Sequence, residues 1–298
     1  MIPSISAPRL QIILAALLMS TSGAAIKACD SFSNWQVACF RAGMAAIVFL
    51  VVIPGVVRSF NRRTAAIGFA YAGASVLFVL ATKLTTAANA IFLQSTSPIT
   101  IVLLSTWLLK EPLRRRDALF MVALAAGLSL FFFGSSQPTG SAPDPLRGNL
   151  LALASGLFWA VTVTGLRWLS HSGKGGENLG AAAVTFGCLI ACAITLPMAL
   201  PVRQSHVTDW LTIIYLGIFG VALVFILLSR AMRQVNAIEA GLILLLEPAL
   251  NPLWAWVLQG ENPGIPALAG GAIILTATAV HTCWPTKGAA PLSEAASS

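Results

Sequence analysis

Ten long apolar runs divide the sequence, and each is about as long as a membrane-spanning helix. A helix that crosses the hydrocarbon core needs about 20 consecutive, mostly apolar residues. Only 9% of the residues are charged, whereas a water-soluble domain carries about 25%. Most of the molecular surface must therefore face lipid. The runs comprise residues 10–28, 35–54, 65–82, 88–109, 117–133, 148–169, 179–200, 209–229, 236–258 and 265–283.

These runs predict an all-α integral membrane protein with ten transmembrane helices. The hydrocarbon core offers no water, so each spanning backbone must satisfy its own hydrogen bonds, as a helix does. Residues that favour turns separate the runs, as in the segment 134–148. The last residues, 285–298, are small and polar, and we expect a disordered cytoplasmic tail.

The distribution of lysine and arginine predicts the orientation in the cell inner membrane. With the N-terminus inside, thirteen of the 18 basic residues fall in cytoplasmic segments and four in outer ones, while Arg41 lies within the second run. Cytoplasmic loops are enriched in these residues, so both termini are predicted to be cytoplasmic. The net charge of +8 then reflects orientation, and we expect no nucleic-acid partner, since no basic face with interleaved aromatic residues is present.

A weak internal repeat relates the two halves of the chain. A shift of 150 residues aligns Pro98 with Pro248 and Glu111 with Glu261 without a gap. Each half holds five runs, an odd number, so the second half must be inverted relative to the first. We predict a first repeat over residues 1–140 and an inverted second repeat over 141–284. Inverted repeats are typical of alternating-access transporters, whose site lies at the repeat interface near the midplane.

Two segments resemble the signature of the EamA-type drug/metabolite transporters. Residues 88–112 read ANAIFLQSTSPITIVLLSTWLLKEP and residues 237–263 read AIEAGLILLLEPALNPLWAWVLQGENP, each a helix with a central proline closed by a Gly-Glu or Lys-Glu pair. The segments 40–45 and 158–167 resemble the second and sixth spans of that family. The resemblance extends over residues 9–284. It implies a ten-helix fold with a central cavity and export of metabolites, with bacterial amino-acid exporters, including those for aromatic amino acids, as the most similar branch.

Glu247 is the outstanding candidate for a functional residue. It lies near the middle of the ninth run, where burying a carboxylate costs about 2.5 kcal/mol or more. It could bind a substrate ammonium group or couple a proton, or it could brace the backbone opened by Pro248. Pro98 and Pro248 each free a carbonyl one turn earlier, and Pro252 adds a second predicted break.

Other polar and aromatic residues in the middle of the runs are candidates for a substrate site. Their hydroxyl and amide groups would donate hydrogen bonds to the carboxylate of a substrate, and an apolar side chain of the substrate would lie against their aromatic rings. A structural role in packing is the alternative for each. The candidates are Gln94, Ser95, Asn251, Trp159, Trp254, Phe78, Tyr71 and Ser22.

The remaining charged residues in or near the runs favour structural roles. Arg41 could reach the outer interface, pair with a carboxylate or hold a substrate carboxylate, and we favour the structural role. Lys27 and Lys83 end their runs on the outer side and are predicted to anchor them at the interface. Glu111 and Glu261 close their helices and are predicted to pair with a base or cap a neighbour.

Taken with the inverted repeat, these features favour a secondary transporter for a small metabolite, most simply an amino acid. The alternatives are a transporter of another neutral or cationic metabolite or drug, or a membrane-embedded enzyme or receptor. The sequence holds neither a nucleotide-binding motif nor a Cys/His cluster with metal spacing, so we expect no catalytic residues, cofactor or metal. The expected partners are a small-molecule substrate and the lipid bilayer, with a monomer as one option.

Cysteine labelling tests the predicted orientation. A cysteine placed in the loop 135–147 should react with a membrane-impermeant maleimide added to intact cells, because the charge bias puts that loop outside. A cysteine at Arg58, on the predicted cytoplasmic side, is the matched control and should react only after permeabilisation. The reverse pattern would show that the orientation is wrong.

Overall fold

The computed structural model describes residues 6–109, 115–132, 143–170 and 176–259, and eight positions between 265 and 280. Within these ranges the fold is helical, with no strand. Glu111, Glu261 and the tail 285–298 lie outside the described residues. The helices are α1 (Ala7–Ser20), α2 (Ser22–Ala28), α3 (Asn34–Val52), α4 (Arg62–Leu84), α5 (Ala87–Gln94), α6 (Ser97–Leu104), α7 (Arg115–Phe132), α8 (Pro145–Ser170), α9 (Gly176–Ala199), α10 (Val207–Tyr215), α11 (Val224–Ala231), α12 (Ala237–Leu244) and α13 (Leu246–Gln259), with the short helices η1 (Val56–Ser59), η2 (Ser105–Leu109) and η3 (Leu216–Leu223).

Seven helical segments of the described chain are long and apolar enough to cross a membrane. The fifth predicted run corresponds to α7, and the ninth is divided between α12 and α13. Most of the tenth run, residues 265–283, lies outside the described residues. The total of ten spans therefore remains a prediction, as does the inverted relation of the two halves.

Two of the predicted spans are broken at equivalent positions in the two halves. Helix α5 covers residues 87–94 and α12 covers residues 237–244, the same span shifted by 150. Each begins at a side-chain cap. The Thr86 hydroxyl accepts a hydrogen bond from the Asn89 backbone amide (3.1 Å), and the side-chain oxygen of Asn236 accepts one from the Glu239 backbone amide (2.7 Å). Each also ends shortly before a proline, which cannot donate to the preceding turn.

Pro98 and Pro248 lie in the first turns of α6 and α13, immediately after these breaks. The missing proline amides leave the carbonyls of Gln94 and Leu244 without their usual helical donors. Pro252 differs from its prediction, because α13 continues through it from Leu246 to Gln259. A proline removes one hydrogen bond, and a helix packed on both sides of it need not end there.

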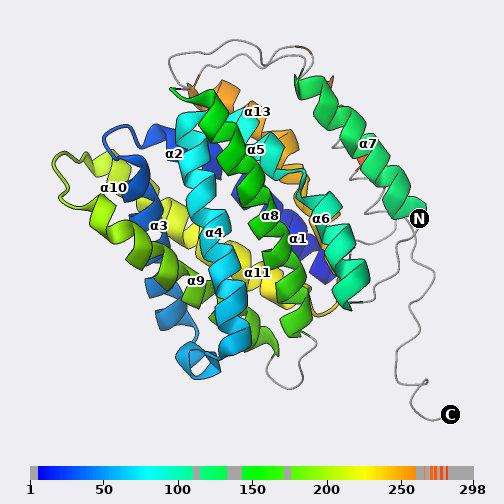
Figure 1. The fold of residues 1–298 in the computed structure, drawn as a ribbon, viewed down its shortest axis with the longest axis horizontal. Helices are drawn as coiled ribbons and strands as arrows, with labels where there is room; N and C mark the ends of the chain where they lie inside the picture. The colour runs from blue at the N-terminus through cyan, green and yellow to red at the C-terminus, as the bar shows by residue number, and fades with distance from the viewer. Residues whose placement is uncertain are drawn as a thin grey trace.

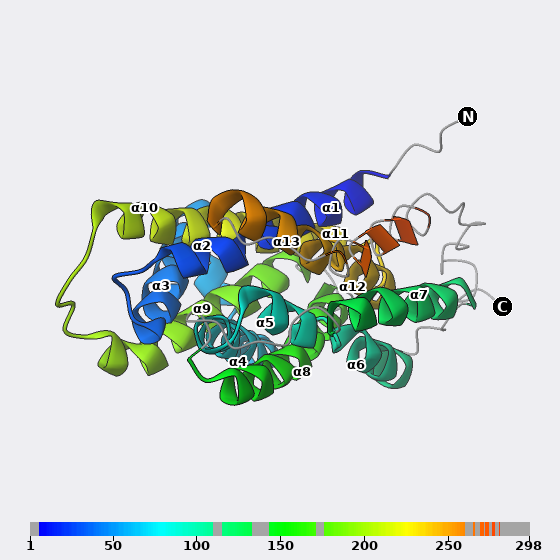
Figure 2. The same cartoon turned by 90° about the horizontal axis from the view of Figure 1, so that it is seen from above.

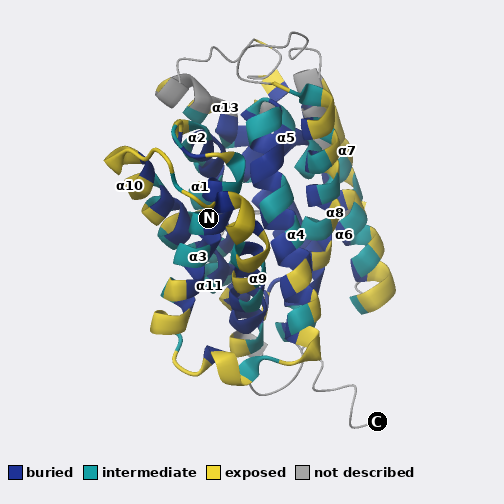
Figure 3. Cartoon of the chain, turned by 60° about the vertical axis from the view of Figure 1, so that its left-hand side comes forward, coloured by how far each residue is buried: buried dark blue, intermediate teal, exposed yellow. Residues whose placement is uncertain are grey.

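Helices from the two halves of the chain pack directly against one another (Figures 1 and 2). Helix α4 lies against α8 and α9, and α3 also packs on α9. In the reciprocal arrangement, α1 packs on α11, α12 and α13. The core of the molecule is thus the interface between its halves. Large apolar side chains such as Val51, Phe69 and Ile194 are exposed on outward faces, where they suit lipid contact. Figure 3 shows the buried residues concentrated along the interior of the bundle.

Helices α4 and α9 approach most closely where two glycines face each other. A methyl group on Gly68 would lie 2.6 Å from the Ala183 carbonyl oxygen, and one on Gly187 would lie 2.8 Å from the Tyr71 ring. Backbone atoms therefore contact across this crossing, a form of packing that small residues permit in membranes. The contact fixes the position of Tyr71, which lines the cavity described below.

Replacing Gly187 with alanine should destabilise the protein, because the new methyl group would meet the Gly68 carbonyl oxygen, and backbone cannot move aside as a side chain can. Overpacking of this kind costs about 1–3 kcal/mol. Gly43→Ala is the matched control, since its methyl would lie 3.3 Å from the Cys192 sulfur, an atom at the end of a side chain. Thermal unfolding in detergent measures both. An equal melting temperature for the two variants would contradict the close crossing.

Candidate functional site

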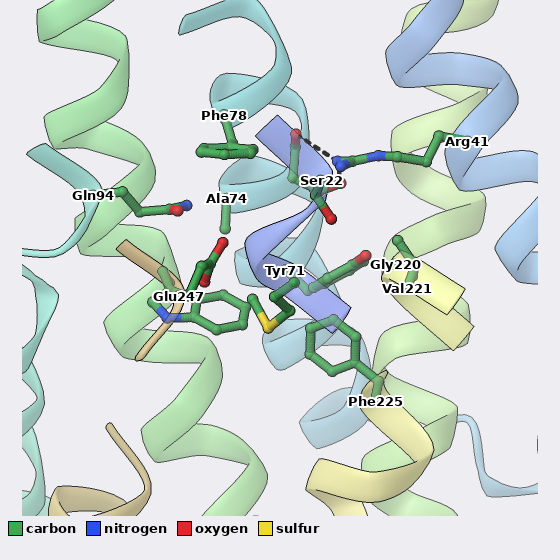
Figure 4. Close-up of a pocket in the computed structure, with 13 residues that line it drawn as sticks. Ser22, Arg41, Tyr71, Ala74, Phe78, Gln94, Gly220, Val221, Phe225 and Glu247 are labelled. Carbon is green, nitrogen blue, oxygen red and sulfur yellow. Dashed lines mark hydrogen bonds between the residues drawn. The ribbon is translucent and has the colours of Figure 1, made fainter. Parts of the chain in front are cut away.

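A small cavity lies at the interface between the two halves (Figure 4). It encloses about 50 Å³ and is smaller than the roughly 300–1,000 Å³ of common small-molecule sites. In this conformation a substrate fits only if the lining side chains or helices move apart. The residues that line it come from both halves: Met19, Ser22, Arg41, Tyr71, Ala74, Ser75, Phe78, Gln94, Trp159, Gly220, Val221, Phe225 and Glu247.

Arg41 enters the cavity from α3 and is only 5% exposed. Its Nη2 donates to the Ser75 hydroxyl (2.8 Å) and to the Ser75 carbonyl oxygen (3.2 Å) on α4. Its Nε is buried without a hydrogen-bond partner. These neutral acceptors orient the guanidinium group but do not neutralise its charge. Of the three roles that the sequence left open for Arg41, the structure disfavours a position at the outer interface, and its charge is available to an anionic group.

Glu247 lies on the opposite side of the cavity, in the first turn of α13. Figure 4 shows Arg41 and Glu247 entering from opposite sides. Within the described part of the chain, the Glu247 carboxylate has no hydrogen bond and no ion pair, with Arg41 or with any other residue. Among these residues, Glu247 makes no hydrogen bond to the backbone near Pro248, so the hypothesis that it braces this backbone finds no support here. The cavity thus holds one basic and one acidic side chain that are not joined to each other.

Gln94 is positioned by a short chain of hydrogen bonds. Its Nε2 donates to the Ser155 hydroxyl (2.7 Å), which donates in turn to the Ala74 carbonyl oxygen (2.8 Å). Gly156 allows α8 to pack on the backbone of Gln94, where an added methyl would lie 3.0 Å from its carbonyl oxygen. The side-chain amide of Gln94 is therefore held at the cavity edge by α4 and α8. Its side-chain oxygen, Oε1, can still accept a hydrogen bond.

Aromatic rings form much of the remaining wall. The Phe225 ring packs edge-on against Tyr71, with centroids 4.8 Å apart, and against Trp159 at 5.9 Å. Phe78 lies on the other side of the cavity in Figure 4. Such rings exclude water, and exclusion of water strengthens electrostatic interactions with the two charged groups.

A second, smaller cavity adjoins the first. It shares Gln94, Trp159 and Glu247 with the first and is also lined by Ser95 and Pro248. The Ser95 hydroxyl donates to the Ile91 carbonyl oxygen of its own helix (2.6 Å). Ser95 and Pro248 therefore line the second cavity and not the main one. The other predicted residues that line the main cavity are Ser22, Tyr71, Phe78, Gln94, Trp159 and Glu247.

Asn251 and Trp254 differ from the prediction, because neither lines the main cavity. The Asn251 Nδ2 donates to the Ser20 carbonyl oxygen (3.2 Å), and the Trp254 Nε1 donates to the Ser20 hydroxyl (2.8 Å). Helix α1 ends at Ser20, and Thr21 separates it from α2. Both side chains from α13 therefore satisfy polar groups at the break in the first span.

Sequence reasoning missed several lining residues as well. Gly220, Val221 and Phe225 carry no charge and belong to ordinary apolar runs, so only their position in the fold marks them. Arg41 gave a clear signal, because it is a charged residue at the eighth position of an apolar helix. The direction in which its side chain points, however, depends on the rotation of α3 about its own axis. The contact with Ser75 fixes that rotation.

Comparison with known proteins finds a family likeness along nearly the whole chain. A sequence model of the EamA-like transporter family matches residues 9–133 and again residues 146–283. A solved crystal structure with a TM-score of 0.72 and 23% sequence identity covers 94% of this chain and 99% of its own, which shows a shared fold.

Individual relatives are also transporters by name. The threonine/homoserine exporter RhtA of Escherichia coli (strain K12) is 30% identical over 212 residues. That match spans 70% of this chain and 66% of the exporter, slightly under two thirds of its length. The uncharacterized transporter YetK of Bacillus subtilis (strain 168) is 26% identical over 218 residues, or 67% of this chain and 63% of YetK.

Proposed function

Since the chain belongs to the EamA-like transporter family, we propose that it is a secondary transporter that exports an amino acid across the cytoplasmic membrane by alternating access. The observation that carries the proposal is the placement of Arg41 and Glu247 on opposite sides of one cavity without an ion pair between them. A zwitterion has one group for each: its carboxylate for Arg41 and its ammonium group for Glu247.

The cost of burying charge explains why such a site favours a zwitterion. A charge removed from water costs several kcal/mol unless an opposite charge compensates it. A cation alone would leave Arg41 uncompensated, and an anion alone would leave Glu247 uncompensated. Only a solute with both charges compensates both residues together, so the site discriminates by the cost it imposes on the wrong solutes.

The same lining disfavours phosphorylated solutes. A phosphate group carries up to two negative charges and is usually held by clustered arginine or lysine side chains. Among the described residues that line the cavity, Arg41 is the only basic one. The name of the Escherichia coli relative, a threonine/homoserine exporter, independently supports an amino acid as the substrate.

Contacts at one end of the bundle support the alternating-access part of the proposal. Lys27, in the last turn of α2, donates to the Thr85 carbonyl oxygen at the end of α4 (3.1 Å). Lys83, in the last turn of α4, donates to the Cys29 carbonyl oxygen at the end of α2 (2.7 Å). These two hydrogen bonds join the ends of α2 and α4 to each other. Anchoring at the membrane interface stays a prediction for both lysines.

A comparable contact joins two helix ends in the second half of the chain, at the other end of the bundle. Arg167, near the end of α8, donates to the Met232 carbonyl oxygen at the end of α11 (2.6 Å), and the Ser170 hydroxyl donates to the same oxygen (2.9 Å). Helix α8 runs antiparallel to α4, since Gly148 lies beside Thr85 and Gly165 beside Ile67. The two sets of contacts therefore lie at opposite ends of the bundle. Breaking them in turn would open the cavity to one side and then to the other.

Glu247→Gln should lower amino-acid flux into proteoliposomes by about tenfold or more, because a hydrogen bond to a charged group contributes about 1.5–3 kcal/mol. The substitution keeps the shape of the side chain and removes its charge. A panel of zwitterionic, anionic and cationic solutes identifies the substrate class of the unmodified protein in the same assay.

Glu239→Gln is the matched control for this variant. Glu239 is also a buried acid, on the adjoining helix α12, but it forms an ion pair with Arg9 (2.7 Å) and does not line the cavity. Its loss should lower thermal stability and leave the apparent KM near that of the unmodified protein. Normal flux in Glu247→Gln would remove the ground for a zwitterionic substrate.

A further inference from the structure

The span formed by α10, η3 and α11 contains a π-helical stretch beside the cavity. This stretch, Leu216–Leu223, brings Gly220 and Val221 to the cavity wall. π-Helical turns are rare and are frequent at functional sites, because the extra residue per turn changes which side chains face a given direction. In this span it places a residue without a side chain against the space that a substrate would occupy.

The position of the π-helical stretch is fixed from its other side. A methyl group on Gly217 would lie 2.6 Å from the Met44 side chain on α3, so the stretch and α3 are in close contact. Met44 lies one turn beyond Arg41 on the same helix. The contact therefore holds the π-helical stretch against α3, the helix that also carries Arg41.

Space at Gly220 is limited by Ser22. A methyl group added to Gly220 would lie 3.1 Å from the Ser22 hydroxyl oxygen, which also lines the cavity. Figure 4 shows Ser22 and Gly220 on the Arg41 side, across from Glu247. The wall thus includes small residues, Ser22, Ala74, Ser75 and Gly220, as well as the bulky rings of Phe78, Trp159 and Phe225.

We infer that Gly220, together with Ser22, sets the upper size limit of the substrate side chain and restricts transport to amino acids with small side chains. The inference rests on the proposed function, which assigns the charged groups of the substrate to Arg41 and Glu247. With those groups held, the substrate side chain lies against the part of the cavity wall to which Gly220 and Ser22 belong. The wall is already tight at this point, because even a methyl group on Gly220 would lie 3.1 Å from the Ser22 hydroxyl oxygen.

The test compares amino acids of increasing size in the same proteoliposomes. Gly220→Ala should lower the flux of threonine and leucine by about tenfold relative to that of alanine and serine, because one methylene in a fitted pocket changes selectivity by roughly 10–200-fold. Ser22→Ala in the Gly220→Ala background removes the hydroxyl that the new methyl meets and should restore part of the threonine flux.

Two comparisons separate a selectivity effect from a general loss. Gly43→Ala adds a methyl at the α3–α9 contact, away from the cavity, and should leave the flux ratios unchanged. If Gly220→Ala does not fold, Ser22→Ala alone still tests the inference, because it should raise leucine flux relative to alanine flux.

The outcomes are distinct for the two levels of the proposal. If the unmodified protein transports no amino acid, the proposed function fails and this inference fails with it. If it transports amino acids but Gly220→Ala and Ser22→Ala change all fluxes by the same factor, the proposed function stands and the size limit at Gly220 is overturned.

Discussion

A buried arginine and a buried glutamate that line one cavity, and are not paired with each other, are the constraint on which the rest of the structure depends. Arg41 is oriented by Ser75, and the Glu247 carboxylate has no partner among the described residues. Within a bilayer such groups are costly unless they face water or an opposite charge. A zwitterionic substrate would supply an opposite charge to each of them.

The surrounding helices have features that follow from this constraint. The breaks before Pro98 and Pro248 interrupt two spans beside the cavity and bring Gln94 and Glu247 to its edge. Irregular backbone is tolerated at membrane depth where it is buried in protein or lines a cavity. The break at Thr21 follows the same rule, because side chains from α13 bind the polar groups of Ser20. Packing between the halves then holds both charges in one small space.

Much of this arrangement could be predicted from the sequence, but its three-dimensional contacts could not. A glutamate in the middle of an apolar run and a proline repeated 150 residues later are visible without a structure, and they led to Glu247 and to the helix breaks. The role of Arg41 stayed open among three alternatives, because the sequence gives its depth in α3 but not the direction it faces. Asn251 was predicted to lie at the substrate site because it is a polar residue in the middle of an apolar run. Its partner in the structure, Ser20, lies at the break at Thr21, which contains no proline and therefore gives no signal in the sequence.

The most direct test of the zwitterion site uses the unmodified protein and chemically altered substrates. Proteoliposomes are loaded with an unlabelled amino acid that the protein transports, and uptake of the radiolabelled form is measured against two competitors: the methyl ester, which lacks the carboxylate, and the N-acetyl derivative, which lacks the ammonium group. Each leaves one buried charge uncompensated, so each should compete at least about tenfold more weakly than the parent amino acid. Competition by both derivatives as strong as that of the parent would contradict the assignment of Arg41 and Glu247.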